Sequence, residues 1–152
     1  MPEKRTIDRA RRDARQGKAP STQAGEFVRE EMDHIREGKH GARSAKQAIA
    51  IGLSKARRAG VKLPAPKPGQ ASARTRKQAT REVKRARTKS SSTSSAKRSR
   101  AATQALKKEG RAAASHLALS KQAKRSARSR SAKSRSQQAT RAARTRNKAK
   151  DN

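Results

Sequence analysis

The feature that most limits the fold of this chain is the position of its large apolar residues. Counting Met, Ile, Leu, Val and Phe, the 152 residues contain fifteen, and only four of these follow Leu63. Without apolar side chains to bury, the remaining 89 residues cannot form a core of their own. The distribution predicts an all-α protein: a small αα-hairpin with a short extra N-terminal helix, followed by a long basic low-complexity tail that is disordered or transiently helical when free.

Charge is distributed as unevenly as the apolar residues. Residues 1–37 contain nine Lys/Arg and eight Asp/Glu, whereas residues 38–152 contain the other 34 Lys/Arg and only three acidic residues. A nearly neutral head is therefore joined to a polycationic remainder. Such asymmetry indicates a polyanionic partner, either nucleic acid or an anionic surface.

Local patterns divide the head into helices. Residues 1–20 are typical of a short helix and a linker. From Ser21, a good N-cap, large apolar residues recur every three or four positions until Gly38. A second helix is expected between Ser44, another N-cap, and Gly60, a typical helix terminator.

These two helices should fold back on each other over residues 21–63 as the hairpin, with Gly52 permitting a close approach. The expected hairpin core is Phe27, Val28, Met32, Ile35, Ile49 and Leu53. A strand over the alternating "AIAIGL" is the alternative, which the flanking caps disfavour. The hairpin is small enough that self-association or a bound partner is expected to support it, through Ile51, Val61 and Leu63.

Residues 64–71 form a proline-rich linker before the basic tail, residues 72–152. Alanine, Lys and Arg favour helices in this tail near residues 73–88, 96–109 and 115–130, the first capped by Ser72. Dense like charge opposes their folding until a partner neutralises it.

Catalysis and cofactor binding are not expected, because so small a core offers no water-excluding pocket. The chain has no cysteine, no glycine-rich phosphate loop and no nucleophile motif. The possible general bases are three histidines, His34, His40 and His116. The sequence therefore predicts a protein that is not an enzyme.

A metal site is likewise not expected. Glu30 and His34 are four residues apart on one helix and His40 follows nearby, so a carboxylate and imidazole cluster can be drawn. The competing interpretation is a solvated helix face with local pairs such as Arg29 with Asp33. The sequence favours the solvated face.

Phosphate neutralisation is the chemistry that the basic residues predict. Phe27 is the sole aromatic residue, so no platform exists for stacking unpaired bases, and duplex backbone binding is favoured over base readout. The candidate nucleic-acid-binding residues are Lys46, Lys55, Arg57, Arg58, Arg74, Arg76, Lys77, Lys84, Arg85, Arg87, Lys97, Arg98, Arg100, Lys107, Lys108, Lys121, Lys124, Arg125, Arg128, Arg130, Lys133, Arg135, Arg141, Arg144 and Arg146.

The expected function is low-specificity, histone-like binding of double-stranded DNA. Three alternatives stay open: an RNA- or ribosome-associated protein, a helix-turn-helix that reads the major groove with its second helix, and an adaptor whose hairpin binds a protein. No apolar run reaches the length of a membrane span and the first residues lack a signal core. We therefore expect a cytoplasmic, nucleoid-associated protein.

The segment "GEFVREEMDHIREGKHGARSAKQAIAIGLSKARRAG" resembles a small family of bacterial proteins with an uncharacterised domain. Phe27, the "REGKHG" turn, Ser44, "KQAIAI" and "ARRAG" carry the resemblance. It implies no activity and no site residues. The tail is loosely similar to the tails of linker-histone-like bacterial nucleoid proteins, although it lacks their Ser-Pro and Thr-Pro repeats.

Overall fold

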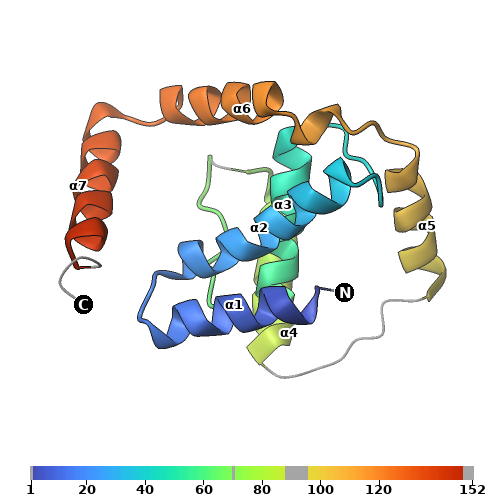
Figure 1. The fold of residues 1–152 in the computed structure, drawn as a ribbon, viewed down its shortest axis with the longest axis horizontal. Helices are drawn as coiled ribbons and strands as arrows, with labels where there is room; N and C mark the ends of the chain where they lie inside the picture. The colour runs from blue at the N-terminus through green and yellow to red at the C-terminus, as the bar shows by residue number, and fades with distance from the viewer. Residues whose placement is uncertain (1, 70, 88–95, 149–152) are drawn as a thin grey trace. The chain divides into compact units, whose positions relative to one another are not determined.

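A computed structural model describes residues 2–69, 71–87 and 96–148 of the chain, and every regular element in these residues is a helix (Figure 1). The elements are α1 (Lys4–Arg15), α2 (Pro20–Arg36), α3 (Ala45–Arg58), α4 (Ala73–Arg87), α5 (Ala96–Lys107), η1 (Ala112–Ala114), α6 (His116–Arg128) and α7 (Ala132–Lys148). They form two compact units, Met1–Ser115 and His116–Asn152. The all-α prediction is confirmed, and the strand alternative for "AIAIGL" is wrong because this segment lies within α3.

The observed ends of α2 and α3 can be compared with the caps and terminators that the sequence predicted. Ser44 Oγ accepts a hydrogen bond from the Gln47 backbone N–H at 3.2 Å, and Gly60 has a φ of 94°, so both predicted ends of α3 are confirmed. Ser21 is not the N-cap of α2, because the helix begins one residue earlier, at Pro20. Proline suits the first helical position, since its φ is already helical and it has no N–H to leave unpaired.

The contact between α2 and α3 forms the predicted hairpin. Phe27, Met32 and Ile35 are buried on α2, while the other predicted core residues, Val28, Ile49 and Leu53, are half-buried. A Cβ on Gly52 would lie 2.7 Å from Val28 Cα. Gly52 therefore permits the close helix approach that the sequence indicated.

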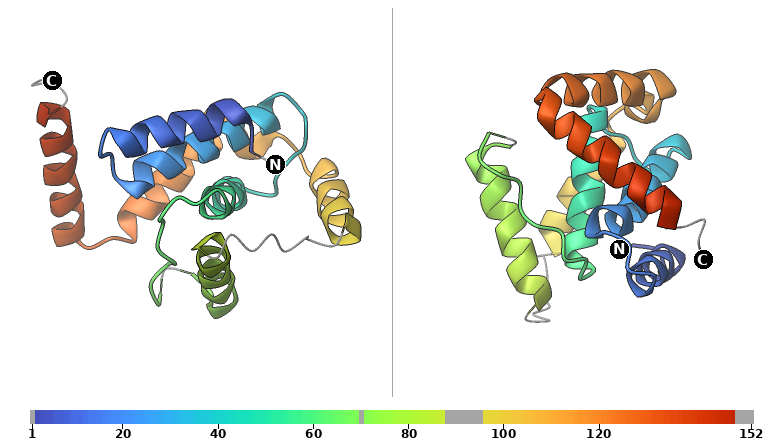
Figure 2. Two further views of the ribbon diagram at one scale, coloured as in Figure 1. Left: turned by 90° about the horizontal axis from the view of Figure 1, so that it is seen from below. Right: turned by 90° about the vertical axis from the view of Figure 1, so that its left-hand side faces the viewer.

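Helix α1 supplies part of the same core. Its Ala10 is buried in one cluster with Ala24, Phe27 and Ala56. The half-buried residues around this cluster are Ile7, Leu53, Val61 and Leu63. Figure 2 shows α3 between the α1 and α2 pair on one side and α4 on the other.

Two segments that the sequence assigned to the tail pack on the hairpin. Ala79 of α4 is buried on the face that contacts α3, and Ala113 and Ala114 of η1 are buried against α2 and α3. The backbone N–H of Gly41 donates to the Leu106 carbonyl at 2.9 Å. The structure thus adds contacts between these segments and the hairpin, because alanine and backbone groups supply contacts that a count of large side chains omits.

The predicted tail helices near 73–88, 96–109 and 115–130 correspond to α4, α5 and α6, and residue 88 lies outside the described residues. Ser72 Oγ accepts from the Thr75 backbone N–H at 3.2 Å, which confirms the predicted cap of α4. Helix α7 was not predicted. Its alanines and long polar side chains have high helix propensity but no apolar periodicity, which was the signal used.

Candidate nucleic-acid interface

Helix α4 is the most strongly cationic element packed on the hairpin. It contains seven Lys/Arg and one acidic residue, Glu82. Glu82 is 6% exposed and faces α3, where its carboxylate accepts a hydrogen bond from Ser54 Oγ and lies 4.0 Å from an Arg57 nitrogen. The exposed face of α4 therefore carries its positive charges without a carboxylate among them.

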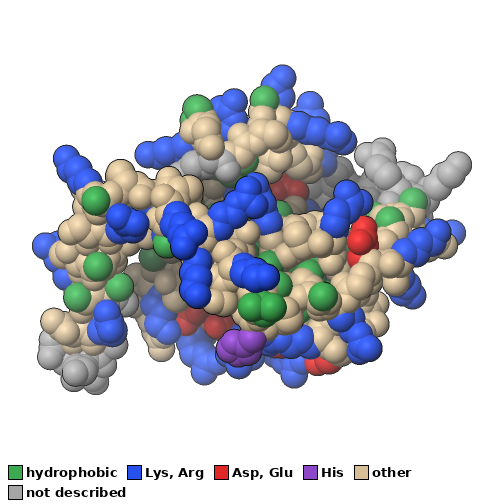
Figure 3. All heavy atoms as spheres, turned by 90° about the horizontal axis from the view of Figure 1, so that it is seen from above, with side chains coloured by type: hydrophobic (Ala, Val, Ile, Leu, Met, Phe, Trp, Pro, Cys, Tyr) green, Lys and Arg blue, Asp and Glu red, His purple; other side chains and the backbone are tan. Residues whose placement is uncertain are grey.

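Most of the predicted nucleic-acid-binding side chains lie at the surface, and Figure 3 shows Lys and Arg spread over one face. The exposed set is Lys46, Arg58, Arg74, Lys77, Lys84, Arg85, Arg100, Lys107, Lys108, Lys121, Lys124, Arg125, Arg128, Arg130, Lys133, Arg135, Arg141, Arg144 and Arg146. Arg76 is half-buried, and the side chains of Arg87, Lys97 and Arg98 lie outside the described residues. Exposed Arg81 on α4 belongs with this set, although the sequence analysis omitted it.

Two residues of the predicted set face the protein interior. The side chain of Lys55 is 14% exposed, with its Nζ 2.6 Å from Glu31 Oε2 and 3.4 Å from Glu30 Oε1. The side chain of Arg57 is 8% exposed, and burial lowers its pKa while the nearby Glu82 carboxylate opposes that change. Because both cations neutralise buried carboxylates, we leave them out of the candidate interface.

The second unit is cationic along both helices. Helix α6 has four Lys/Arg and α7 has six, and neither contains an acidic residue. No residue of α6 is buried. Both helices therefore carry only positively charged ionisable side chains apart from His116.

The helix face assigned to solvent by the sequence is a buried polar cluster instead. Glu30 and Glu31 are 4% and 0% exposed, because the segment before α1 and the turn after α2 cover them. The Glu3 backbone N–H donates to Glu30 Oε2 at 3.1 Å, and Glu3 Oε1 lies 2.9 Å from His34 Nε2. The predicted pair of Arg29 with Asp33 is replaced by one between Arg36 and Asp33, at 3.5 Å.

Hydrogen bonding within this cluster shifts one carboxyl group strongly. The hydrogen bond with His34, followed by the one from Arg5, lowers the pKa of Glu3 from its ordinary 4.5 to about 2. Glu37 and Lys39 form an exposed pair at 2.8 Å, which lowers the pKa of the carboxyl group and raises that of the amine. No sequence signal linked Glu3 to His34, because the two are 31 positions apart.

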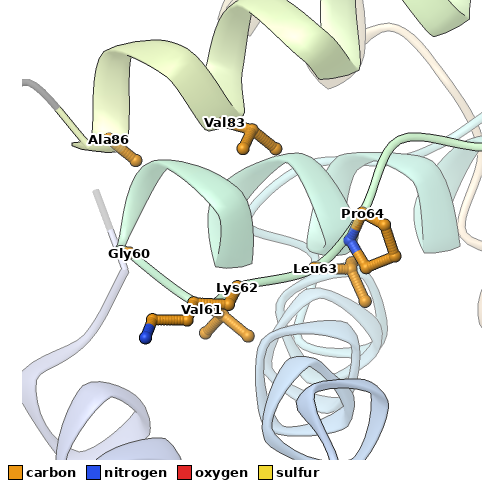
Figure 4. A pocket seen from close by; sticks show the side chains of 7 residues that line it. All are labelled: Gly60, Val61, Lys62, Leu63, Pro64, Val83 and Ala86. Carbon is orange, nitrogen blue, oxygen red and sulfur yellow. The ribbon is translucent and has the colours of Figure 1, made fainter.

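An apolar groove of about 460 Å³ lies between the segment after α3 and helix α4 (Figure 4). Val61, Leu63 and Pro64 line it from one side, and Val83 and Ala86 of α4 line the other. Val61 and Leu63, which were expected to serve self-association, thus already have neighbours within the chain. Self-association remains a prediction.

The hairpin and its N-terminal helix are similar to a family of known sequences. Residues 3–68 match DUF6496, a family of unknown function. The match covers α1, the hairpin and most of the proline-rich linker, in agreement with the expected resemblance to an uncharacterised domain. No curated protein and no solved structure matches the chain. Among the described residues, no helix combines the length and apolar character needed to cross a membrane.

Proposed function

We propose that this protein binds double-stranded DNA with little sequence preference, by neutralising backbone phosphates in the manner of a histone-like, nucleoid-associated protein. The observation that carries the proposal is the inward orientation of Glu82 on α4. Because this carboxylate faces α3, it does not lie among the exposed cations Arg74, Lys77 and Arg81. Without this arrangement, a carboxylate among the cations would repel phosphate.

The charge spacing of α4 suits a duplex. Fifteen residues make a helix about 22 Å long, at about 1.5 Å per residue. A duplex segment of that length carries about 13 phosphate charges, one per roughly 1.7 Å of axis. The five exposed cations of α4 among the described side chains correspond to about two-fifths of that number.

Base readout is disfavoured by the same structure. Phe27 is 1% exposed, so the chain's one aromatic ring cannot stack on an unpaired base. In the helix-turn-helix alternative α3 would enter the major groove, but its Lys55 and Arg57 side chains are occupied by buried carboxylates. Phosphate contacts by exposed side chains remain the favoured mode.

A salt titration of the full-length protein on a random-sequence duplex tests the proposal. The slope of log affinity against log salt should be steep for the natural sequence, because each phosphate neutralised contributes about 0.9. The triple variant Arg74→Gln, Lys77→Gln and Arg81→Gln should reduce the slope by about 2.7. Binding that is insensitive to salt would refute phosphate neutralisation.

The matched control removes the same charge from another exposed helix face. In α1, Lys4→Gln, Arg11→Gln and Arg12→Gln alter three exposed cations of the nearly neutral head. This variant should change the slope by less than about 1, since those residues are not expected to contact phosphate. If the α1 and α4 triple variants reduced the slope equally, only net charge would matter and α4 would not be an interface.

Structured RNA is the principal rival ligand, because short basic helices also bind RNA backbones. Competition of a duplex DNA against a folded RNA at the same salt concentration separates the two. Stronger displacement by the RNA would reassign the partner while keeping the phosphate mechanism. Capture of a protein partner that survives nuclease treatment and high salt would instead favour the adaptor.

A further inference from the structure

Three potential metal ligands meet where α2 turns toward α3. Glu31 and His34 lie on α2, and His40 follows in the turn. Each offers one ligand atom, and these atoms all lie within 4.8 Å of one another. The Glu31 side chain is fully buried, whereas the His34 and His40 side chains are 14% and 15% exposed, so an ion can reach the imidazoles from solvent.

The separation between two of these ligands already fits a bound ion. His40 Nε2 lies 3.4 Å from Glu31 Oε1. Tetrahedral zinc, with bonds of about 2.1 Å to nitrogen and oxygen, places neighbouring donor atoms about 3.4 Å apart. The ligand atom of His34 lies within 4.8 Å of the other two, so a movement on the order of 1 Å brings it to the same separation.

Hydrogen bonding orients His40 for coordination. Its Nδ1 lies 3.1 Å from the Gly41 carbonyl oxygen, so Nδ1 carries the hydrogen and donates it. In the neutral ring, Nε2 then presents its lone pair to the Glu31 carboxylate. Two acceptors that face each other require a cation between them, and a backbone carbonyl behind the ring is a common arrangement for metal-bound histidine.

The surroundings of Glu31 favour a divalent cation. Glu3, Glu30 and Glu31 gather in this cluster, where half-buried Lys55 contacts Glu30 and Glu31, while exposed Arg5 and Lys39 pair with Glu3. Lys55 Nζ approaches Glu31 Oε2 and leaves Oε1 toward His40, and neither oxygen accepts a hydrogen bond of good geometry from the described residues. Among the described residues, the two buried carboxylates of Glu30 and Glu31 therefore share a single contacting Lys/Arg side chain.

We propose that Glu31, His34 and His40 bind a zinc ion. Two imidazoles and one carboxylate are a typical ligand set for zinc, with a fourth position left for water. Glu3, whose Oε1 lies 2.9 Å from His34 Nε2, is a positioning residue that fixes the His34 ring. The ion links α2 to the turn whose next residue, Gly41, is hydrogen-bonded to Leu106, and so stabilises the first unit.

Isothermal titration of zinc chloride into the tag-free, chelator-treated full-length protein tests this site. We expect about one ion per chain. His40→Gln and His34→Gln should each reduce the affinity more than about 100-fold, beyond the 10–100-fold typical of outer residues. His116→Gln, which changes the exposed histidine of α6, should leave it unchanged.

Thermal unfolding provides a second readout that does not depend on titration heats. Zinc should raise the melting temperature of the natural sequence and of His116→Gln, but not that of His40→Gln. His40 is the decisive position, because Glu31→Gln would leave Lys55 without its closest partner and could unfold the protein. Zinc binding of equal strength in His40→Gln and the natural sequence, or no binding at all, overturns the proposal.

Discussion

Replacing Gly52 by alanine tests the helix contact at the centre of the first unit. The new Cβ would lie 2.7 Å from Val28 Cα and 3.0 Å from Val28 N, and both of these atoms belong to the backbone of α2. Non-bonded carbon atoms are optimally about 3.5–4.0 Å apart. Since backbone cannot rotate away as a side chain can, α2 and α3 must separate by about 0.8 Å or more to remove the overlap.

The expected free-energy change is the sum of two opposing effects. Alanine has a higher helix propensity than glycine, which stabilises a helix by about 1 kcal/mol. Overpacking typically costs about 1–3 kcal/mol, and contact with backbone places Gly52→Ala toward the upper part of that range. We therefore expect a net destabilisation of about 1–2 kcal/mol. Gly25, an exposed position of α2 with no atom near its Cβ site, should instead gain about 1 kcal/mol on the same substitution.

Denaturant unfolding of both variants, followed by circular dichroism, measures the difference of about 2–3 kcal/mol that this reasoning predicts. Gly25→Ala controls for the change in helix propensity, because both substitutions add the same methyl group to a helix interior. If Gly52→Ala proves as stable as Gly25→Ala, the close approach of α2 and α3 is refuted, and with it the packing that covers the polar cluster.

Two further substitutions test how the region after the linker is held. Glu82→Gln should destabilise the protein by about 1–3 kcal/mol in denaturant unfolding, because Arg57 loses its charged partner. Glu109→Gln, which removes the surface ion pair with Arg43, should cost less than about 1 kcal/mol. Equal losses of stability in the two variants would contradict a buried pair between Arg57 and Glu82. Gly41→Ala should reduce the free energy of unfolding by about 2 kcal/mol or more, since its Cβ would overlap the Glu109 carbonyl. The same variant should increase hydrogen exchange of the amide of residue 41, which is bonded to Leu106. Gly110→Ala, with open space around its Cβ site, should leave that exchange unchanged.

Local signals predicted the helices well. The caps at Ser44 and Ser72 and the terminator Gly60 act on neighbouring backbone groups, so their effect is legible from a few residues. Ser21 failed because proline at the preceding position was an equally local signal and fixed the start of α2. Phe27 was placed correctly in the core, since its helical spacing identified the buried face.

The candidate interface was predictable in composition but not in detail. From the sequence, Lys55 and Arg57 were predicted to bind nucleic acid with the other cations of a basic helix. In the structure each of them neutralises a buried carboxylate instead. In the sequence, Glu82 is a single acidic residue among cations. In the structure it faces α3, and this orientation keeps the exposed surface of α4 positive. Nothing within four residues of these positions distinguishes a buried charge from an exposed one.

The amino-acid sequence by itself determined the all-α fold, the position of the hairpin and the excess of positive charge, because helix propensity, capping and charge are properties of single residues and near neighbours. The tertiary structure alone decided that Glu31, His34 and His40 meet in one cluster and that α4 packs on α3. The packing of α4 depends on a segment distant in sequence returning to α3, and the polar cluster on α2 is contacted by the distant residues Glu3 and Lys55. Burial, which sets whether a charged group is solvated or needs a partner, is a consequence of those long-range contacts.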